Sequence, residues 1–471
     1  MCGITAVISN NNIFELLFES LFHLQHRGQN SFGFAFNHNK NIKLFKQDGL
    51  LCNCSIENIK TKIGIGHVRY PTSGNLNKNE IQPFILENIA LCHNGTIANY
   101  KKLKEEYKDL FNTNSDSDSE LLLNIFVYEL NKLITIKKIN KKYTNFLDYL
   151  DNNTIISVIK KVSEKCKGGY SVIIMIQNYG LICFKDPYGI RPLVFGSSNN
   201  SYIISSESSS IINLGENSKI IKELDGGEIV IFKENINNRI TYDTLKYSNK
   251  IQKPCIFEWI YIAREDSLIH NVSVYASRLN MGFYLAKKLI KENIDVNCID
   301  AVIPIPDTSR PVALKISEVL NIPYREAIIK NRYIARTFIM DNQIKRKKNI
   351  KRKLSVIDSM VANKNILIVD DSIVRGNTIN HIIEMLYNSK VNSIIVASSA
   401  PMIKYQNFYG LDIPTKGELI ANNNTIKDIE SKLNIKKLIF LSIEEICKSV
   451  SDLNKKLTDF ELSVFNGKYI H

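Results

Sequence analysis

The chain has 471 residues, of which 44% are hydrophobic, and it carries a formal net charge of +14. This length predicts two or three domains with sizeable cores, and this composition is typical of a folded globular protein. No apolar run reaches the ~20 residues of a membrane-spanning helix, and residues 10–15 are too polar for a signal peptide. We therefore expect a cytoplasmic protein without a membrane partner.

The basic charge favours either a nucleic-acid partner or a composition bias, since the chain is rich in Lys, Asn and Ile. The densest run, "KRKKNIKRK" at 345–353, has seven basic residues in nine. It lacks the aromatic side chains on which bases stack, and it fits a solvated loop. We predict no nucleic-acid partner.

The chain begins "MCGI", which places Cys2 first once the initiator Met is removed. One interpretation is a small buried residue that opens an edge strand. The other is an N-terminal nucleophile, because an α-amino group titrates near ~7.7–8.0 and can activate the thiol of the same residue without a histidine. The nine cysteines include no C-x-x-C, and "CNC" at 52–54 has no matching pair, so we expect reduced thiols and no zinc site.

Short apolar runs separated by turns dominate residues 1–235, with a helical stretch at 117–133. A polar linker is expected at 246–254. Beyond it, apolar runs that end in an acidic residue alternate with helix-like segments, a pattern typical of a parallel α/β sheet.

Five short motifs follow one another in the N-terminal half: "MCGI", "LQHRGQ" (24–29), "GHVRYPT" (66–72), "HNG" (93–95) and "SDSE" (117–120). Taken singly, "HNG" is a common turn and "SDSE" is a helix start. The histidines His26, His67 and His93 also leave open a papain-like Cys–His pair.

The most specific stretch is "ILIVDDSIVRGNT" at 366–378. It predicts a buried strand, an acidic pair where the strand ends, a loop rich in hydroxyl groups, and a helix whose apolar residues recur at helical spacing. Phosphate suits the N-terminus of such a helix. Adjacent carboxylates suit ribose hydroxyls or Mg²⁺.

This stretch resembles the signature with which type I phosphoribosyltransferases bind 5-phosphoribosyl 1-pyrophosphate (PRPP). The resemblance implies that Asp370 and Asp371 hold the ribose hydroxyls and Mg²⁺, and that "PIPDTSRP" (304–311) takes the pyrophosphate with Thr308 near the metal. The residues expected at the 5-phosphate are Ser372, Ile373, Val374, Arg375, Gly376, Asn377 and Thr378. Asn377 departs from the Thr that is usual in relatives, which puts one hydroxyl contact in doubt.

The N-terminal half resembles the class II glutamine amidotransferase domain of N-terminal-nucleophile hydrolases. The resemblance implies an αββα sandwich in which Cys2 attacks the glutamine amide. Asn94 and the Gly95 N–H would form the oxyanion hole. The remaining glutamine-site residues would be Arg69 at the α-carboxylate, Asp118 at the α-ammonium and Arg27 in the motif that supports the nucleophile.

Together the two halves resemble the glutamine PRPP amidotransferases, which make 5-phosphoribosylamine, glutamate and pyrophosphate in the first committed step of purine synthesis. The expected fold is an α+β glutaminase domain (1–235), an α/β parallel-sheet phosphoribosyltransferase domain (255–445) and a C-terminal tail (446–471). The resemblance also implies a homotetramer, one Mg²⁺ per subunit and inhibition by purine nucleotides.

The motifs argue against three other classes of protein. A sugar-phosphate amidotransferase lacks the 366–378 signature, and an asparagine synthetase needs an S-G-G-x-D-S loop that is absent here. A nucleic-acid-binding regulator has no need of an intact set of amidotransferase motifs.

Two further expectations concern cysteine and the segment 330–353. Asn407 and the lack of a cysteine pair in "FELSVFNGKY" (460–469) leave too few thiolates for the iron–sulfur cluster that one branch of the family carries, so we predict none. Lys330 and Tyr333, within "KNRYIARTFI", are expected to contact PRPP from a lid that closes when PRPP binds.

Overall fold

The computed structural model describes residues 2–39, 41–57, 59–70, 78–140, 146–331 and 354–471. The chain forms two compact units. The first comprises Met1–Pro254 with Phe408–Asp412 and His471, and the second comprises Cys255–Asn407 and Ile413–Ile470.

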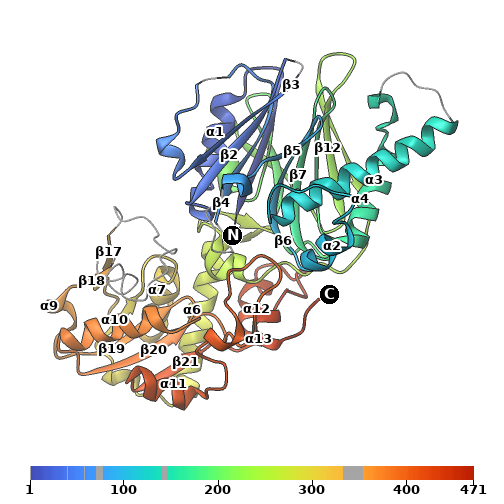
Figure 1. The fold of residues 1–471 in the computed structure, drawn as a ribbon. Coiled ribbons are helices and arrows are strands. Elements are labelled where there is room, and N and C mark those ends of the chain that lie inside the picture. The colour runs from blue at the N-terminus through green and yellow to red at the C-terminus, as the bar shows by residue number, and fades with distance from the viewer. Residues whose placement is uncertain (1, 40, 58, 71–77, 141–145, 332–353) are drawn as a thin grey trace. The chain divides into compact units, whose positions relative to one another are not determined.

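Two antiparallel sheets form the centre of the first unit (Figure 1). The strands of the first sheet, in spatial order, are β11 (Lys219–Glu223), β9 (Val194–Ser198), β10 (Ser201–Ser205), β1 (Gly3–Ile8), β4 (Ile63–Arg69), β2 (Ser31–His38) and β3 (Asn41–Asp48). Those of the second are β13 (Ile240–Lys246), β12 (Glu228–Glu234), β8 (Gly180–Lys185), β7 (Gly168–Ile176), β6 (Ile89–Ile97) and β5 (Phe84–Leu86).

Helices cover both outer faces, so the layers run α, β, β, α. Side chains of α1 (Phe14–Phe22) and α5 (Ser209–Ile212) pack on the first sheet. Those of α2 (Tyr100–Glu106), α3 (Asp118–Asn140) and α4 (Asn152–Lys165) pack on the second. Alternate strand residues point inward and form an apolar core between the sheets.

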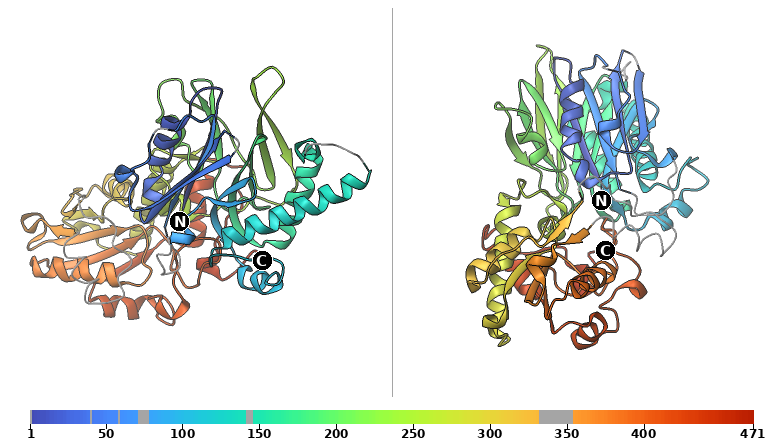
Figure 2. Two further views of the ribbon diagram at one scale, coloured as in Figure 1. Left: turned by 45° about the horizontal axis from the view of Figure 1, so that its top comes forward. Right: turned by 90° about the vertical axis from the view of Figure 1, so that its left-hand side faces the viewer.

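The second unit is built on a parallel sheet, in the order β16 (Ala301–Pro304), β19 (Asn365–Asp370), β20 (Ser393–Ser398) and β21 (Lys437–Phe440). Figure 2 shows its strands and helices from two further directions. The helices are α6 (Val274–Lys291), α7 (Arg310–Leu320), α9 (Asp358–Val361), α10 (Asn377–Asn388), α11 (Ile426–Leu433), α12 (Ile443–Ser451) and α13 (Ser463–Asn466). Two antiparallel strand pairs also belong to it, β14 (Leu268–Ile269) with β15 (Val272–Ser273) and β17 (Ile328–Lys330) with β18 (Leu354–Val356).

Local sequence explains why β19 and α10 form, the strand and helix that flank the 372–378 loop. The strand β19 is apolar and buried, and α10 buries Ile379, Ile382, Ile383 and Leu386 on one face, as their spacing predicts. In the described part of the chain no helix is both long enough and apolar enough to cross a bilayer.

Candidate functional site

The residues around Cys2 hold its backbone in place. Cys2 precedes β1 and is half-buried, with its Sγ 4.0 Å from the Tyr70 carbonyl oxygen. The Arg27 Nε donates a hydrogen bond of 2.9 Å to the Cys2 carbonyl oxygen, and its guanidinium pairs with Glu207. Both members of this ion pair are buried. Arg27 therefore braces the candidate nucleophile from behind.

Glu207 belongs to none of the five amidotransferase motifs and lies in the run "SSES" (205–208). Its carboxylate also contacts His26 Nε2 at 2.8 Å. Because removing one partner of a buried pair leaves an uncompensated charge, Glu207 is needed to hold Arg27.

No histidine of the described residues is bonded to the Cys2 thiol. His26 faces Glu207, and His93 Nδ1 lies 2.9 Å from Ser119 Oγ. His67 is fully buried, and burial lowers its pKa well below the usual value. The geometry therefore favours the N-terminal amine over a Cys–His pair as the base for Cys2.

Asn94 and Gly95 lie side by side on β6. The Asn94 side chain is fully buried, and neither its Oδ1 nor its Nδ2 has a hydrogen-bond partner in the described structure. Gly95 has φ +139°, and a Cβ there would lie 2.0 Å from the Gly169 carbonyl oxygen. Since an unpaired buried amide is costly, Asn94 has the environment of a donor that awaits a ligand oxygen.

Electrostatics link Cys2 to the same strand. Burial raises the pKa of the Cys92 thiol well above its usual value, and the negative charge of a Cys2 thiolate adds to this effect. Cys92 stands two residues before Asn94 on β6, so the candidate nucleophile and the candidate oxyanion donor belong to one neighbourhood of the first unit.

Two charged residues flank this neighbourhood. Arg69 ends β4, and its guanidinium pairs with the Glu80 carboxylate. Asp118 begins α3, where its Oδ2 accepts the Ile97 N–H at 2.9 Å and its Oδ1 lies 3.7 Å from His93 Nδ1. Burial lowers the pKa of His93, and the nearby Asp118 charge partly offsets this effect.

In the second unit, Asp370 and Asp371 lie where β19 ends. Burial, and then the neighbouring Asp371 charge, raises the pKa of Asp370 well above its usual range. Asp371 accepts hydrogen bonds from Thr308 Oγ1 and, at 2.8 Å, from Ser372 Oγ. Parallel strands β16 and β19 thus bring Thr308 to the acidic pair.

The described residues hold no cluster of three His, Cys, Asp or Glu side chains able to bind a metal. Mg²⁺ needs only one or two carboxylates when substrate oxygens and water complete its shell. Asp370 and Asp371 fit this requirement, because a bound cation would relieve the repulsion between them.

The loop from Ser372 to Thr378 leads into α10. Ile373 is 3% exposed and packs in the core, whereas Arg375, Asn377 and Thr378 are exposed. The Arg375 Nε donates to Glu418 at 2.9 Å. The loop therefore presents backbone N–H groups and polar side chains at a helix N-terminus.

Lys330 lies at the end of β17, and its Nζ is 2.6 Å from Asp307 Oδ2. Asp307 also pairs with Arg310, and both belong to the 304–311 loop. Lys330 thus contacts the segment expected to take pyrophosphate. Tyr333 and the basic run 345–353 lie outside the described residues.

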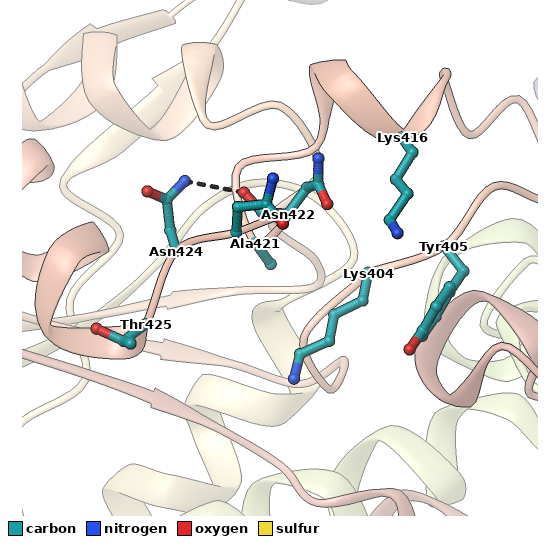
Figure 3. Close-up of a pocket in the computed structure, with 8 residues that line it drawn as sticks. Lys404, Tyr405, Lys416, Ala421, Asn422, Asn424 and Thr425 are labelled. Atoms are coloured by element: carbon teal, nitrogen blue, oxygen red, sulfur yellow. Dashed lines mark hydrogen bonds between the residues drawn. The ribbon is translucent and has the colours of Figure 1, made fainter.

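A polar hollow of about 320 Å³ lies close to the 372–378 loop (Figure 3). Its lining includes Ala421, which directly follows Ile420. The Ile420 N–H donates to the Val374 carbonyl oxygen at 2.9 Å. Figure 3 shows Lys404, Tyr405 and Lys416 around the open space. Sequence reasoning did not single out these residues, which carry no motif of their own.

Comparison with known proteins defines the class. A family model described as a glutamine amidotransferase domain matches residues 67–213, and one described as a phosphoribosyl transferase domain matches residues 282–407. The chain is therefore a glutamine amidotransferase joined to a phosphoribosyltransferase.

Full-length relatives identify the family. Proteins named amidophosphoribosyltransferase are 38% identical in Pasteurella multocida, covering 100% of this chain and 93% of that protein, and 36% identical in Saccharomyces cerevisiae, covering 100% and 92%. The chain belongs to the amidophosphoribosyltransferase family, whose members are the enzymes of the first committed step of purine synthesis.

Solved structures agree. The glutamine PRPP amidotransferase of Bacillus subtilis, in complex with ADP and GMP, superposes with a TM-score of 0.82 at 30% identity, covering 100% of this chain and 97% of that one. A structure described as the allosteric regulatory enzyme of purine biosynthesis gives a TM-score of 0.83 at 30% identity, with 100% and 96% covered. The predicted combination of an αββα glutaminase fold with a type I phosphoribosyltransferase fold is confirmed.

Proposed function

We propose that the first unit releases ammonia from glutamine at Cys2 and that the second unit transfers it to C1 of PRPP. The Cys2 sulfur forms a bond to the amide carbon while the C=O π electrons move to oxygen. Collapse of this intermediate expels ammonia, which takes its proton through the Cys2 α-amine. Water then cleaves the thioester to glutamate.

The observation that carries the glutamine half is the buried, unpartnered amide of Asn94. We propose that its Nδ2 and the Gly95 N–H stabilise the developing oxyanion. A single donor of this kind contributes about 2.7–4 kcal/mol to the transition state. The mechanism requires removal of Met1, which intact-mass analysis of active protein checks.

For glutamine binding we propose Arg69 at the α-carboxylate and Asp118 at the α-ammonium. Arg69 pairs with Glu80 in the structure, so in this proposal its fork-shaped guanidinium shares its N–H donors between Glu80 and the α-carboxylate. Arg27 supports Cys2 through the Cys2 carbonyl oxygen.

For the second half-reaction we propose Asp370 and Asp371 at the ribose hydroxyls, with Thr308 beside them at Mg²⁺. When bound, Mg²⁺ stabilises the charge that develops on the departing pyrophosphate. The proposed 5-phosphate contacts are Ser372, Ile373 (through its backbone), Val374, Arg375, Gly376, Asn377 and Thr378. Lys330 and Tyr333 complete the proposed PRPP set.

Ammonia attacks C1 as the C1–O bond to pyrophosphate breaks, which yields 5-phosphoribosylamine after loss of a proton. The test is pyrophosphate release by purified protein with glutamine, PRPP and Mg²⁺. Without added ammonia, we expect release only when all three are present. No release with either glutamine or ammonia as nitrogen donor would contradict the proposal.

We further propose purine nucleotides as feedback inhibitors and a homotetramer as the assembly. The nucleotides bound to the Bacillus subtilis relative support the first proposal. The domain division at 1–235, 255–445 and 446–471 likewise stays a proposal, and so does a lid at 330–353.

A further inference from the structure

Lys185, at the end of β8, is the most unusual buried charge of the first unit. Its side chain is fully buried, and its Nζ has no hydrogen-bond partner in the described structure. Burying an unpaired ammonium is costly, so its presence calls for a reason beyond packing.

The register of the second sheet shows where Lys185 points. Along β6, β7 and β8, two cross-strand rows belong to the apolar core between the sheets: Ala90, Met175 and Leu181, then Cys92, Ile173 and Cys183. The next row on the same face is polar and consists of Asn94, Ser171 and Lys185. Lys185 therefore points into the layer between the sheets, two strands away from the proposed oxyanion donor.

Neighbouring acids are committed elsewhere. The Asp186 carboxylate accepts the N–H groups of Tyr170 and Ile190. Burial raises the pKa of Asp186 to about 6, and the nearby Lys185 charge partly offsets this rise. Glu228 precedes Ile229, which pairs with Phe184, and its carboxylate binds the Lys222 Nζ at 2.8 Å. In the described structure neither carboxylate forms a hydrogen bond with the Lys185 Nζ, so Lys185 acts on Asp186 through its charge alone.

Ser171 lies between Asn94 and Lys185 in this row but forms no hydrogen bond with the side chain of either residue in the described structure. Its Oγ donates to the backbone oxygens of Arg191 and Pro192, at 2.9 and 3.2 Å. All three residues of this row are fully buried, so the charge of Lys185 is weakly screened by water.

We propose that Lys185 is a positioning residue for the glutamine half-reaction, whose fixed positive charge in the row of Asn94 favours the negative charge that develops on the substrate amide oxygen. The inference rests on the proposed function of Cys2 and Asn94. Such a charge acts on the transition state more than on bound glutamine, so it changes kcat and leaves KM almost unaltered.

The test compares Lys185→Met, which keeps the length and removes the charge, with Lys185→Arg, which keeps the charge. We expect Lys185→Met to lower kcat for glutamine about tenfold, less than the loss of a direct donor, since strands lie ~4.8 Å apart and Lys185 is two strands away. Lys185→Arg should restore most of this loss. Lys219→Met, exposed on β11, is the matched control.

A second readout separates charge from packing. Because Lys185→Met removes an unpaired buried charge, we expect its melting temperature to equal or exceed that of the wild type, although its kcat is lower. Should this variant fail to fold, Lys185→Gln takes its place against the same arginine comparison.

Three results would overturn the inference: a kcat for Lys185→Met within about twofold of wild type, a change in KM alone, or an arginine variant no better than the methionine one. Wild-type protein without glutaminase activity would instead contradict the function proposed for Cys2. Ammonia-dependent synthesis, which uses the second unit, is expected to stay unchanged in every variant.

Discussion

The amide of Asn94 is buried without a hydrogen-bond partner in the described residues, and this makes its role measurable. Asn94→Ala removes one oxyanion donor, so we expect kcat for glutamine to fall about 10²–10³-fold. KM for glutamine should change little, because the donor acts on the transition state. Steady-state glutaminase assays check this, with ammonia-dependent synthesis as the internal control. A kcat close to that of wild type would remove Asn94 from the oxyanion hole.

Asp370 permits a test that combines stability with function. Burial raises the pKa of Asp370, whereas in the unfolded chain the group ionises near ~3.9. Above that pH the Asp370 carboxyl is ionised in the unfolded chain, while burial disfavours its ionised form in the folded protein, so Asp370 lowers the free energy of unfolding. Below that pH the carboxyl is protonated in both states, and this destabilisation disappears. Asp370→Asn should therefore raise the melting temperature of ligand-free protein at neutral pH while it impairs PRPP use.

The control for this substitution is Asp109→Asn, which removes an exposed carboxylate far from either motif set. Melting curves at neutral pH and near pH ~4 separate the two variants. The stabilisation by Asp370→Asn should shrink at the lower pH, whereas Asp109→Asn should change the melting temperature little at either pH. A melting temperature below that of wild type at neutral pH, with PRPP kinetics intact, would mean that Asp370 is a structural cap of β19.

Single residues also show the limits of sequence reasoning. Cys2, Asn94 and Asp370 stand in motifs whose spacing is short, so they could be found from the chain alone. Glu207 and Lys185 lie far from them in sequence, and strand register and burial reveal them. The ion pair between Arg69 and Glu80 was likewise not foreseen, because Glu80 belongs to no motif.

Strand β6 receives support from a distant part of the chain. The segment Phe408–Asp412 belongs to the first unit, where the Arg191 Nε donates to the Tyr409 carbonyl oxygen at 2.7 Å. Gly410 has φ +99°, and a Cβ there would lie 3.0 Å from the Gly95 Cα. This segment therefore packs directly on the glycine proposed for the oxyanion hole.

Gly410→Ala should displace β6 at Gly95, both by contact and through its left-handed backbone. We expect glutamine kcat to fall by about tenfold, smaller than the loss of a whole donor, with ammonia-dependent synthesis retained. The matched control is Gly417→Ala, whose Cβ would meet no atom within 4 Å. Equal kcat values for the two variants would show that the segment does not support Gly95.

Elements with a strong period were predictable, and contacts between distant elements were not. The strand at 366–369, the helix after it and the long helix near 117–133 appear as β19, α10 and α3, since hydrophobic spacing alone determines such elements. The order of strands in the two sheets depends on long-range packing. The inclusion of Phe408–Asp412 in the first unit could not be predicted for the same reason.

For the complete chain, we predict a protein without an iron–sulfur cluster. Asn407 donates to Glu461 at 3.5 Å, and Glu461 also forms a backbone bridge with Cys255. A cluster needs four thiolates, and the chain has Asn at 407 and no cysteine pair in 460–469. Purified protein should be colourless. An iron-dependent absorption band in the visible range would contradict this.

The central claim is that one chain holds two separable sites, one for glutamine and one for PRPP. It is tested most directly by Cys2→Ala, assayed for pyrophosphate release with PRPP and Mg²⁺ and with either glutamine or ammonia as the nitrogen donor. Cys183→Ala, which removes a buried thiol on β8 that the mechanism does not use, is the matched control. The account predicts that Cys2→Ala loses glutamine-dependent release and keeps ammonia-dependent release at the wild-type rate. Retention of glutamine-dependent release, or loss of both activities in a folded variant, would contradict it.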